Sequence, residues 1–305
     1  MGQIDFEFKR ERKLGEFVQD FINLLKVIYK HLVIVLFRLL VIPICLVVLI
    51  GYYLSTQMSM NANHTNIDYF NVGVSVVSLV LLIMLVSLFA FGFAIEYFIL
   101  LRNRKNISFT SKDIWLQFRN HIYYYLRFFI AMLVVGVLIS IPAALSILLS
   151  AFIPIVGSFA SGIIFAIIGL WFFSAFMLYR ENYVELIDCF GSSFRMLKKK
   201  IFEYGLASYV VSFIFQALLS IITIMPLIIA FVIAYNFIGF DNDFFESGLG
   251  RAMATFGGLV VVLLFIVYYM LSVISYGIIY ETAKELQYGE DVFERIEKLG
   301  GSSNA

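Results

Sequence analysis

Six long apolar stretches constrain this chain more than any other feature of its sequence. A membrane-spanning helix needs roughly 20 apolar residues, whereas a membrane-barrel strand needs about 10 that alternate in polarity. Each stretch has helical length, and none alternates. The expected spans are 32–54, 73–101, 124–149, 153–179, 206–235 and 254–280. We therefore expect an all-α polytopic membrane protein in which six transmembrane helices form three hairpins.

The composition excludes most other classes of protein. Of the 305 residues, 62% are hydrophobic and 14% are charged, against roughly 45–50% and 25% in soluble domains. A soluble globular enzyme, a disordered chain and a disulfide-stapled domain are excluded. The net charge of +1 provides no field that would attract nucleic acid. The two cysteines, Cys45 and Cys189, lie in different environments, so we expect neither a disulfide nor a metal site.

Basic residues gather on one side of the expected membrane. Of the 22 lysines and arginines, only Arg251 lies in the loops 55–72, 150–152 and 236–253. All others lie at or near the termini, the loops on the opposite side, or the adjoining helix ends. Because basic loops stay in the cytoplasm, both termini are expected there.

An amphipathic segment precedes each odd-numbered span, at 13–30, 111–122 and 183–200. Apolar residues three or four apart form one helical face in each segment. Such helices lie in the membrane interface, with the apolar face toward lipid and basic residues near anionic headgroups. The predicted interfacial anchors are Phe17, Phe21, Trp115, Phe118, Phe190 and Phe194.

The three amphipathic segments align without gaps, which predicts an internal repeat. Glu16, Asp113 and Glu185 share one position, and the alignment continues through a phenylalanine and a basic residue. Chance similarity between juxtamembrane helices is the alternative. The predicted organisation is one membrane domain with an N-terminal segment 1–12, repeat units 13–101, 111–179 and 183–280, and a cytoplasmic tail 281–305.

The N-terminal segment alternates in polarity. Ile4, Phe6 and Phe8 are apolar, and charged residues stand between them, which is typical of a short strand. Because this chain offers the strand no partner of its own, it would pair with another protein or another copy. A disordered tail is the alternative.

The stretch from Arg180 to Lys198, with Glu181-Asn182 at its start and Glu185 after them, carries a family resemblance. It resembles bacterial six-helix envelope proteins that are related to the membrane domain of glycerophosphoryl diester phosphodiesterases. The residues 13–16 and 294–300 are similar to the ends of one branch of these proteins. The resemblance implies a helical domain of the bacterial cytoplasmic (inner) membrane. It implies no catalysis, because no residues remain to build the phosphodiesterase barrel.

Two ionisable residues lie clearly inside apolar runs. Arg38 and Glu96 are each about a turn and a half from the cytoplasmic end of their helix, so we expect them to form an ion pair. A snorkelling Arg38 is one alternative, and a proton-coupled site at Glu96 is another. The sequence contains no catalytic motif, and we expect no catalytic residues, no metal ligands and no cofactor.

Polar side chains also follow the last two spans. They predict hydrogen bonds between helices or, alternatively, a polar cavity. The residues are Ser212, Gln216, Ser220 and Thr223 on the fifth helix, and Tyr268, Ser272 and Ser275 on the sixth.

The sequence thus predicts a non-enzymatic component of a bacterial cytoplasmic-membrane assembly. Its expected partners are the phospholipid bilayer and other membrane proteins or further copies of the chain, and not nucleic acid. The alternative is a small-molecule or lipid transporter whose polar site lies between the fifth and sixth helices.

Overall fold

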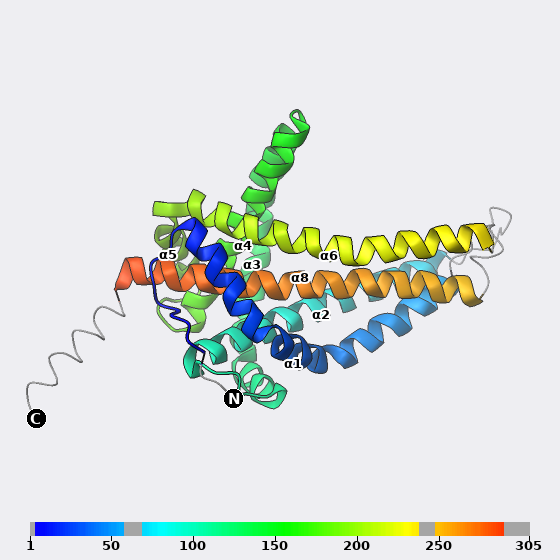
Figure 1. The fold of residues 1–305 in the computed structure, drawn as a ribbon, viewed down its shortest axis with the longest axis horizontal. Coiled ribbons are helices and arrows are strands. Elements are labelled where there is room, and N and C mark those ends of the chain that lie inside the picture. The colour runs from blue at the N-terminus through cyan, green and yellow to red at the C-terminus, as the bar shows by residue number, and fades with distance from the viewer. Residues whose placement is uncertain (1–3, 58–68, 238–247, 290–305) are drawn as a thin grey trace, which may run out of the picture. The chain divides into compact units, whose positions relative to one another are not determined.

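The computed structural model describes residues 4–57, 69–237 and 248–289, and over these residues the chain is all-helical (Figure 1). Among the described residues, six helices are long and apolar enough to cross a membrane, which confirms the predicted class and number of spans. The helices are α1 (Leu14–Gln57), α2 (Tyr69–Arg104), α3 (Ser111–Ala151), α4 (Pro154–Arg180), α5 (Asp188–Leu197), the 3-10 helix η1 (Lys198–Lys200), α6 (Ile201–Phe237) and α8 (Gly248–Tyr288).

The chain divides into two compact units that cut across the predicted repeat units. Unit 2 comprises Val33–Phe93 and Ile214–Met270. Many of its large apolar side chains are exposed, as expected for helices that face lipid. Unit 1 comprises Met1–Leu32, Ala94–Phe213 and Leu271–Ala305, and it holds the buried charges considered below. The threefold repeat stays a prediction.

The predicted amphipathic segments differ in how they join the spans. The segments 13–30 and 111–122 run without a break into α1 and α3, which also continue through Pro43 and Pro142. The third segment forms α5 and η1, which lead directly into α6 at Ile201. Its helix begins at Asp188 and not at 183, because a turn separates it from the end of α4.

The predicted lipid anchors need correction. Phe17, Phe21 and Phe118 are buried within the protein, so they cannot reach lipid. The 3.6-residue period identified their helix faces correctly, but other parts of unit 1 cover those faces. Phe190 is half-buried, whereas Trp115 and Phe194 are exposed.

The N-terminal segment packs on its own chain. Ile4 and Phe8 are buried, the Phe8 ring lies edge-on to Phe98, and the Ile4 N–H donates to the Lys105 carbonyl at 2.8 Å. The described part of the segment is not a strand, so pairing with another protein is not needed to bury its apolar residues. The predicted intermolecular strand is therefore wrong for residues 4–12.

Close packing of α8 on α2 within unit 1 predicts a stability effect. A Cβ atom added at Gly277 would lie 2.6 Å from the Phe98 ring, which is buried and has little room to move. We expect Gly277→Ala to lower the free energy of unfolding by about 1–3 kcal/mol, measured by SDS titration with circular dichroism. Gly136→Ala is the control, because no atom lies within 4 Å of its Cβ. Equal stabilities of the two variants would contradict this packing.

Candidate functional site: a buried charge cluster

The end of α4 fixes the first acidic residue of the site. Glu181 is the C-cap of the helix, and Asn182 follows in the left-handed conformation with φ 59°. The Tyr183 N–H donates to the Leu178 carbonyl at 3.0 Å, and the Asn182 N–H donates to the Tyr179 carbonyl at 3.1 Å. This is a Schellman motif, in which asparagine can take the position usually held by glycine. The Glu181-Asn182 pair thus ends the helix and holds the Glu181 side chain in place.

Glu181 belongs to a buried charge cluster that joins the ends of three helices. We define the cluster as Arg102 of α2, the C-cap Glu181 that follows α4, and Tyr280, Glu281 and Lys284 of α8. Arg102 Nη1 donates to Glu181 Oε1 and to Glu281 Oε1. Lys284 Nζ donates to Glu181 Oε2 at 3.1 Å, and the Tyr280 hydroxyl donates to the same oxygen at 2.8 Å. The side chains of Arg102 and Glu281 are 15% and 1% exposed, so water screens their attraction poorly.

The two basic and two acidic members of the cluster balance in formal charge. Glu281 Oε2 is nevertheless buried without a hydrogen-bond partner among the described residues. Glu281 is therefore held through its other oxygen by Arg102, and Arg102 is the member whose loss would leave most charge uncompensated.

The cluster predicts a pH dependence of stability. Burial alone would raise the pKa of Glu181, but Arg102 and Lys284 outweigh it and hold this pKa below the ordinary value of 4.5. A lowered pKa in the folded state means that Glu181 stabilises the fold above pH 4.5 and that this contribution is lost as the pH falls through its folded pKa. We expect the stability difference between the wild type and Glu181→Gln to shrink below that pH in SDS titrations. The exposed Glu185→Gln is the control, and a constant difference would contradict the prediction.

Arg180, which directly precedes Glu181, forms a second buried ion pair beside the cluster. Arg180 Nη2 lies 3.2 Å from Glu96 Oε1, and the Tyr125 hydroxyl donates to the same oxygen at 2.9 Å. The Glu96 side chain is fully buried. The predicted ion pair of Arg38 with Glu96 is therefore wrong, because Glu96 is paired with Arg180. Arg38 is exposed and belongs to unit 2, and the structure gives Glu96 the basic partner Arg180 instead.

Arg12 joins the N-terminal segment to the same end of α8. Its guanidinium donates to Asp20 Oδ2 at 2.8 Å and to Thr282 Oγ1 at 3.3 Å, and also to the carbonyls of Glu7, Phe8 and Arg10. Burial lowers the pKa of Arg12, and the hydrogen bond to Asp20 acts in the opposite direction. Arg12 therefore fastens the segment to both α1 and α8.

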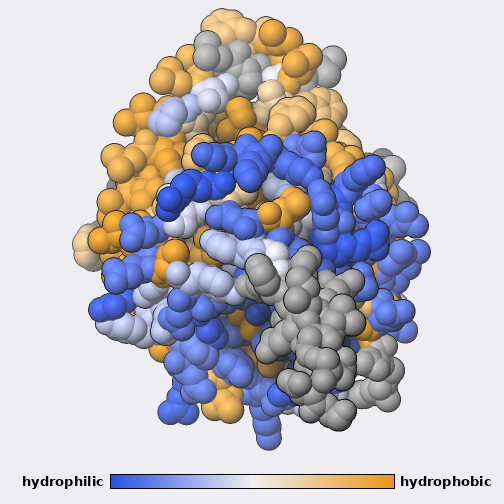
Figure 2. Space-filling view, turned by 90° about the vertical axis from the view of Figure 1, so that its left-hand side faces the viewer, coloured by the Kyte–Doolittle hydropathy of each residue, from blue (hydrophilic) through white to orange (hydrophobic). Residues whose placement is uncertain are grey.

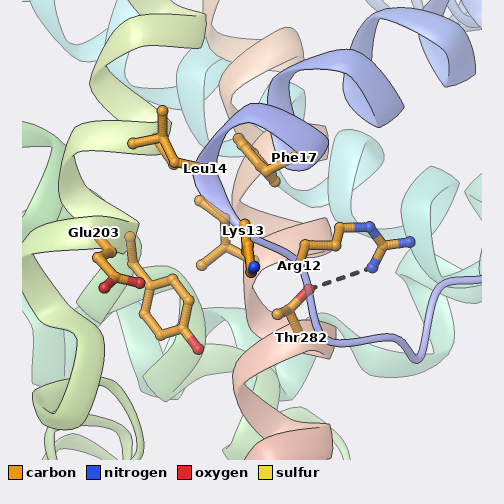
Figure 3. Close-up of a pocket in the computed structure, with 9 residues that line it drawn as sticks. Arg12, Lys13, Leu14, Phe17, Glu203 and Thr282 are labelled. Carbon is orange, nitrogen blue, oxygen red and sulfur yellow. Dashed lines mark hydrogen bonds between the residues drawn. The ribbon is translucent and has the colours of Figure 1, made fainter.

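A small pocket lies beside this arginine (Figure 3). Figure 3 shows Arg12 reaching Thr282, with Glu203 of α6 on the other side. The pocket holds about one water molecule and is too small for an organic substrate. It is lined by Arg12, Lys13, Leu14, Phe17, Glu203, Tyr204, Ala207, Ile279 and Thr282.

The polar residues predicted on the last two spans fall into both units. Ser212, Ser272 and Ser275 are buried in unit 1, whereas Gln216 is exposed and Ser220 and Tyr268 are half-buried in unit 2. The side chain of Thr223 lies outside the described residues. The small pocket is lined by none of the six that are described.

Sequence reasoning missed the cluster because its members look like ordinary loop charges. By their positions in the sequence, Arg102, Arg180 and Lys284 indicate only the orientation of the chain. One sequence feature could have indicated the cluster. Glu181 and Glu281 lie at or near the ends of apolar helices, on the side of the expected membrane where most charged residues are basic. An acidic residue in that place needs a basic partner when the helix end is buried.

Comparisons with family models, with curated proteins and with solved structures find no match for this chain. Among the residues that the structure describes, no group of three His, Cys, Asp or Glu side chains could hold a metal ion. The geometry of unit 1 is therefore the basis for any functional proposal.

Proposed function

We propose that this chain is a non-enzymatic integral component of a protein assembly in the bacterial cytoplasmic membrane, working by contact with lipid and partner proteins. The buried charge cluster carries the proposal. Its charged groups bind one another and fasten α2, α4 and α8 together, which supports a structural role over substrate binding. The resemblance to six-helix envelope proteins supports the same function.

The proposal places both termini and the charge cluster toward the cytoplasm. The excess of basic residues in the loops of that side supports this orientation. The face of the molecule in Figure 2 is largely hydrophilic, with hydrophobic residues gathered toward its upper edge. Such a face suits the water-exposed side of a membrane protein.

Exposed apolar side chains of α3 offer a surface for a partner protein. Trp115 and Leu116 are 46% and 56% exposed, and both lie outside the expected span that starts at residue 124. Burial of such side chains against a partner is favourable, and aromatic residues are enriched in protein interfaces. We propose that this pair contributes to the contact.

Purification of the assembly tests the proposal. The tagged chain is extracted from its own host in mild detergent, and the recovered partners are identified and quantified. We expect a partner in fixed stoichiometry and a several-fold lower recovery with the double variant Trp115→Gln/Leu116→Gln. The control Lys112→Gln/Arg119→Gln changes exposed polar residues of the same helix and should recover the partner normally.

The transporter alternative has one observation in its favour. Ser275 Oγ is buried without a hydrogen-bond partner among the described residues, as in a polar site that awaits a ligand. Reconstitution of the purified chain in vesicles separates the two functions. A chain that is recovered alone and that moves a solute across the vesicle membrane would overturn the assembly proposal.

A further inference from the structure

The inner face of α5 is fixed against α4. Cys189, Met196 and Leu197 are buried. Ser193 Oγ donates to the Trp171 carbonyl at 3.0 Å, and Trp171 Nε1 donates back to the Phe190 carbonyl at 2.9 Å. The orientation of this short helix is therefore determined by protein contacts, and its outer face is presented as a fixed surface.

The outer face of α5 combines apolar and basic side chains. Ile187 directly precedes the helix and is 87% exposed, and Phe194 is 51% exposed. Arg195, Lys198 and Lys199 follow at the C-terminal end and are also exposed. The acidic Asp188 lies at the opposite end, where a carboxylate suits the helix dipole. Lys200 is already paired with Glu11 at 2.7 Å, so it is not counted in the surface.

The chain continues from this surface directly into a membrane-length helix. α6 begins at Ile201, one residue after η1, and Phe202 is exposed at its start. In the proposed orientation these basic side chains directly precede the expected span 206–235, which would place them at the depth of the phospholipid headgroups. Clusters of basic residues at this depth are attracted to anionic lipids, and adjacent apolar side chains enter the acyl boundary.

We propose that the outer face of α5 and η1 binds anionic phospholipid headgroups through Arg195, Lys198 and Lys199, with Ile187 and Phe194 inserted beside them. The inference deepens the lipid part of the proposed function and rests on its cytoplasmic placement of residues 183–200. The proposal distinguishes the segment 183–200, whose outer face contacts lipid, from the segment 13–30, whose apolar face is buried in protein.

Native mass spectrometry of the full chain with phosphatidylglycerol and phosphatidylcholine tests the site. We expect the wild type to retain phosphatidylglycerol preferentially. Arg195→Gln/Lys198→Gln/Lys199→Gln should weaken this retention, by about fivefold for each basic side chain. The control Arg10→Gln/Arg104→Gln/Lys105→Gln removes the same charge from exposed positions outside the three amphipathic segments and should retain the lipid. An equal loss of phosphatidylglycerol retention in both triple variants would overturn the proposed site. Displacement of the bound phosphatidylglycerol by free inorganic phosphate at equal concentration would overturn it as well.

A depth measurement gives an independent result. Gly191 lies between the two apolar residues, and a Cβ added there meets no atom within 4 Å, so Gly191→Cys can carry a fluorescent label in a Cys45→Ser background. In nanodiscs we expect brominated lipid to quench this label more than aqueous iodide does, and the reverse for a label at Lys105→Cys. Equal iodide quenching at both positions would overturn the inference. The partner-recovery experiment tests Trp115 and Leu116 and not the outer face of α5. A negative result for lipid binding would therefore leave the evidence for the assembly unchanged.

Discussion

Replacing Arg102 by methionine is expected to destabilise the protein by about 3–5 kcal/mol, because it leaves Glu181 and Glu281 buried together without their shared cation. Methionine keeps much of the side-chain volume, so the loss measures the charge and not a cavity. SDS titration followed by circular dichroism gives the free energy of unfolding. This is the largest effect we expect from a single substitution in unit 1.

Arg104→Met is the matched control for Arg102→Met. Arg104 lies in the same last turn of α2, but its side chain is 43% exposed and lies 3.9 Å from Asp113. An exposed pair of this kind contributes less than about 1 kcal/mol. Addition of Glu281→Gln to Arg102→Met should restore part of the stability, since it removes one uncompensated carboxylate. Similar stabilities of Arg102→Met and Arg104→Met would show that the cluster does not hold the helices together.

The second large effect is expected at Arg180. Arg180→Met leaves Glu96 buried with the Tyr125 hydroxyl as its partner among the described residues, and we expect a loss of about 3 kcal/mol. A double-mutant cycle with Glu96→Gln should give a coupling energy well above 1 kcal/mol, since the two side chains interact directly.

The same cycle with Arg38 is the control. Arg38 is exposed, so Arg38→Met should couple to Glu96→Gln by no more than about 0.5 kcal/mol. Stronger coupling of Glu96 to Arg38 than to Arg180 would restore the pairing expected from helix depth. It would also contradict the position of Glu96 in the structure.

The contrast between Arg38 and Arg180 shows what the sequence can predict. Apolar runs set the number of spans, and burial of an ionisable residue in such a run correctly marked Glu96 as paired. Depth in the membrane does not specify which helices are neighbours, so it selected Arg38. The true partner comes from the end of α4, and only the tertiary fold brings α4 to α2.

The amphipathic segments show the same limit. The helical period correctly grouped Phe17 with Phe21, but it could not show whether lipid or protein covers that face. For Phe17 and Phe21 the cover is protein, whereas at α5 Met196 and Leu197 are buried and Phe194 is exposed. The charge cluster escaped prediction because its members are far apart in sequence.

Both proposals depend on the cytoplasmic position of the charged end of unit 1, and cysteine labelling in intact cells tests that position most directly. Cys45→Ser provides the background, because the remaining Cys189 is buried. A membrane-impermeant thiol reagent should label Asn63→Cys in intact cells and label Lys105→Cys only after the cells are permeabilised. Labelling of Lys105→Cys in intact cells, with protection of Asn63→Cys, would contradict the orientation and with it the proposed cytoplasmic lipid site.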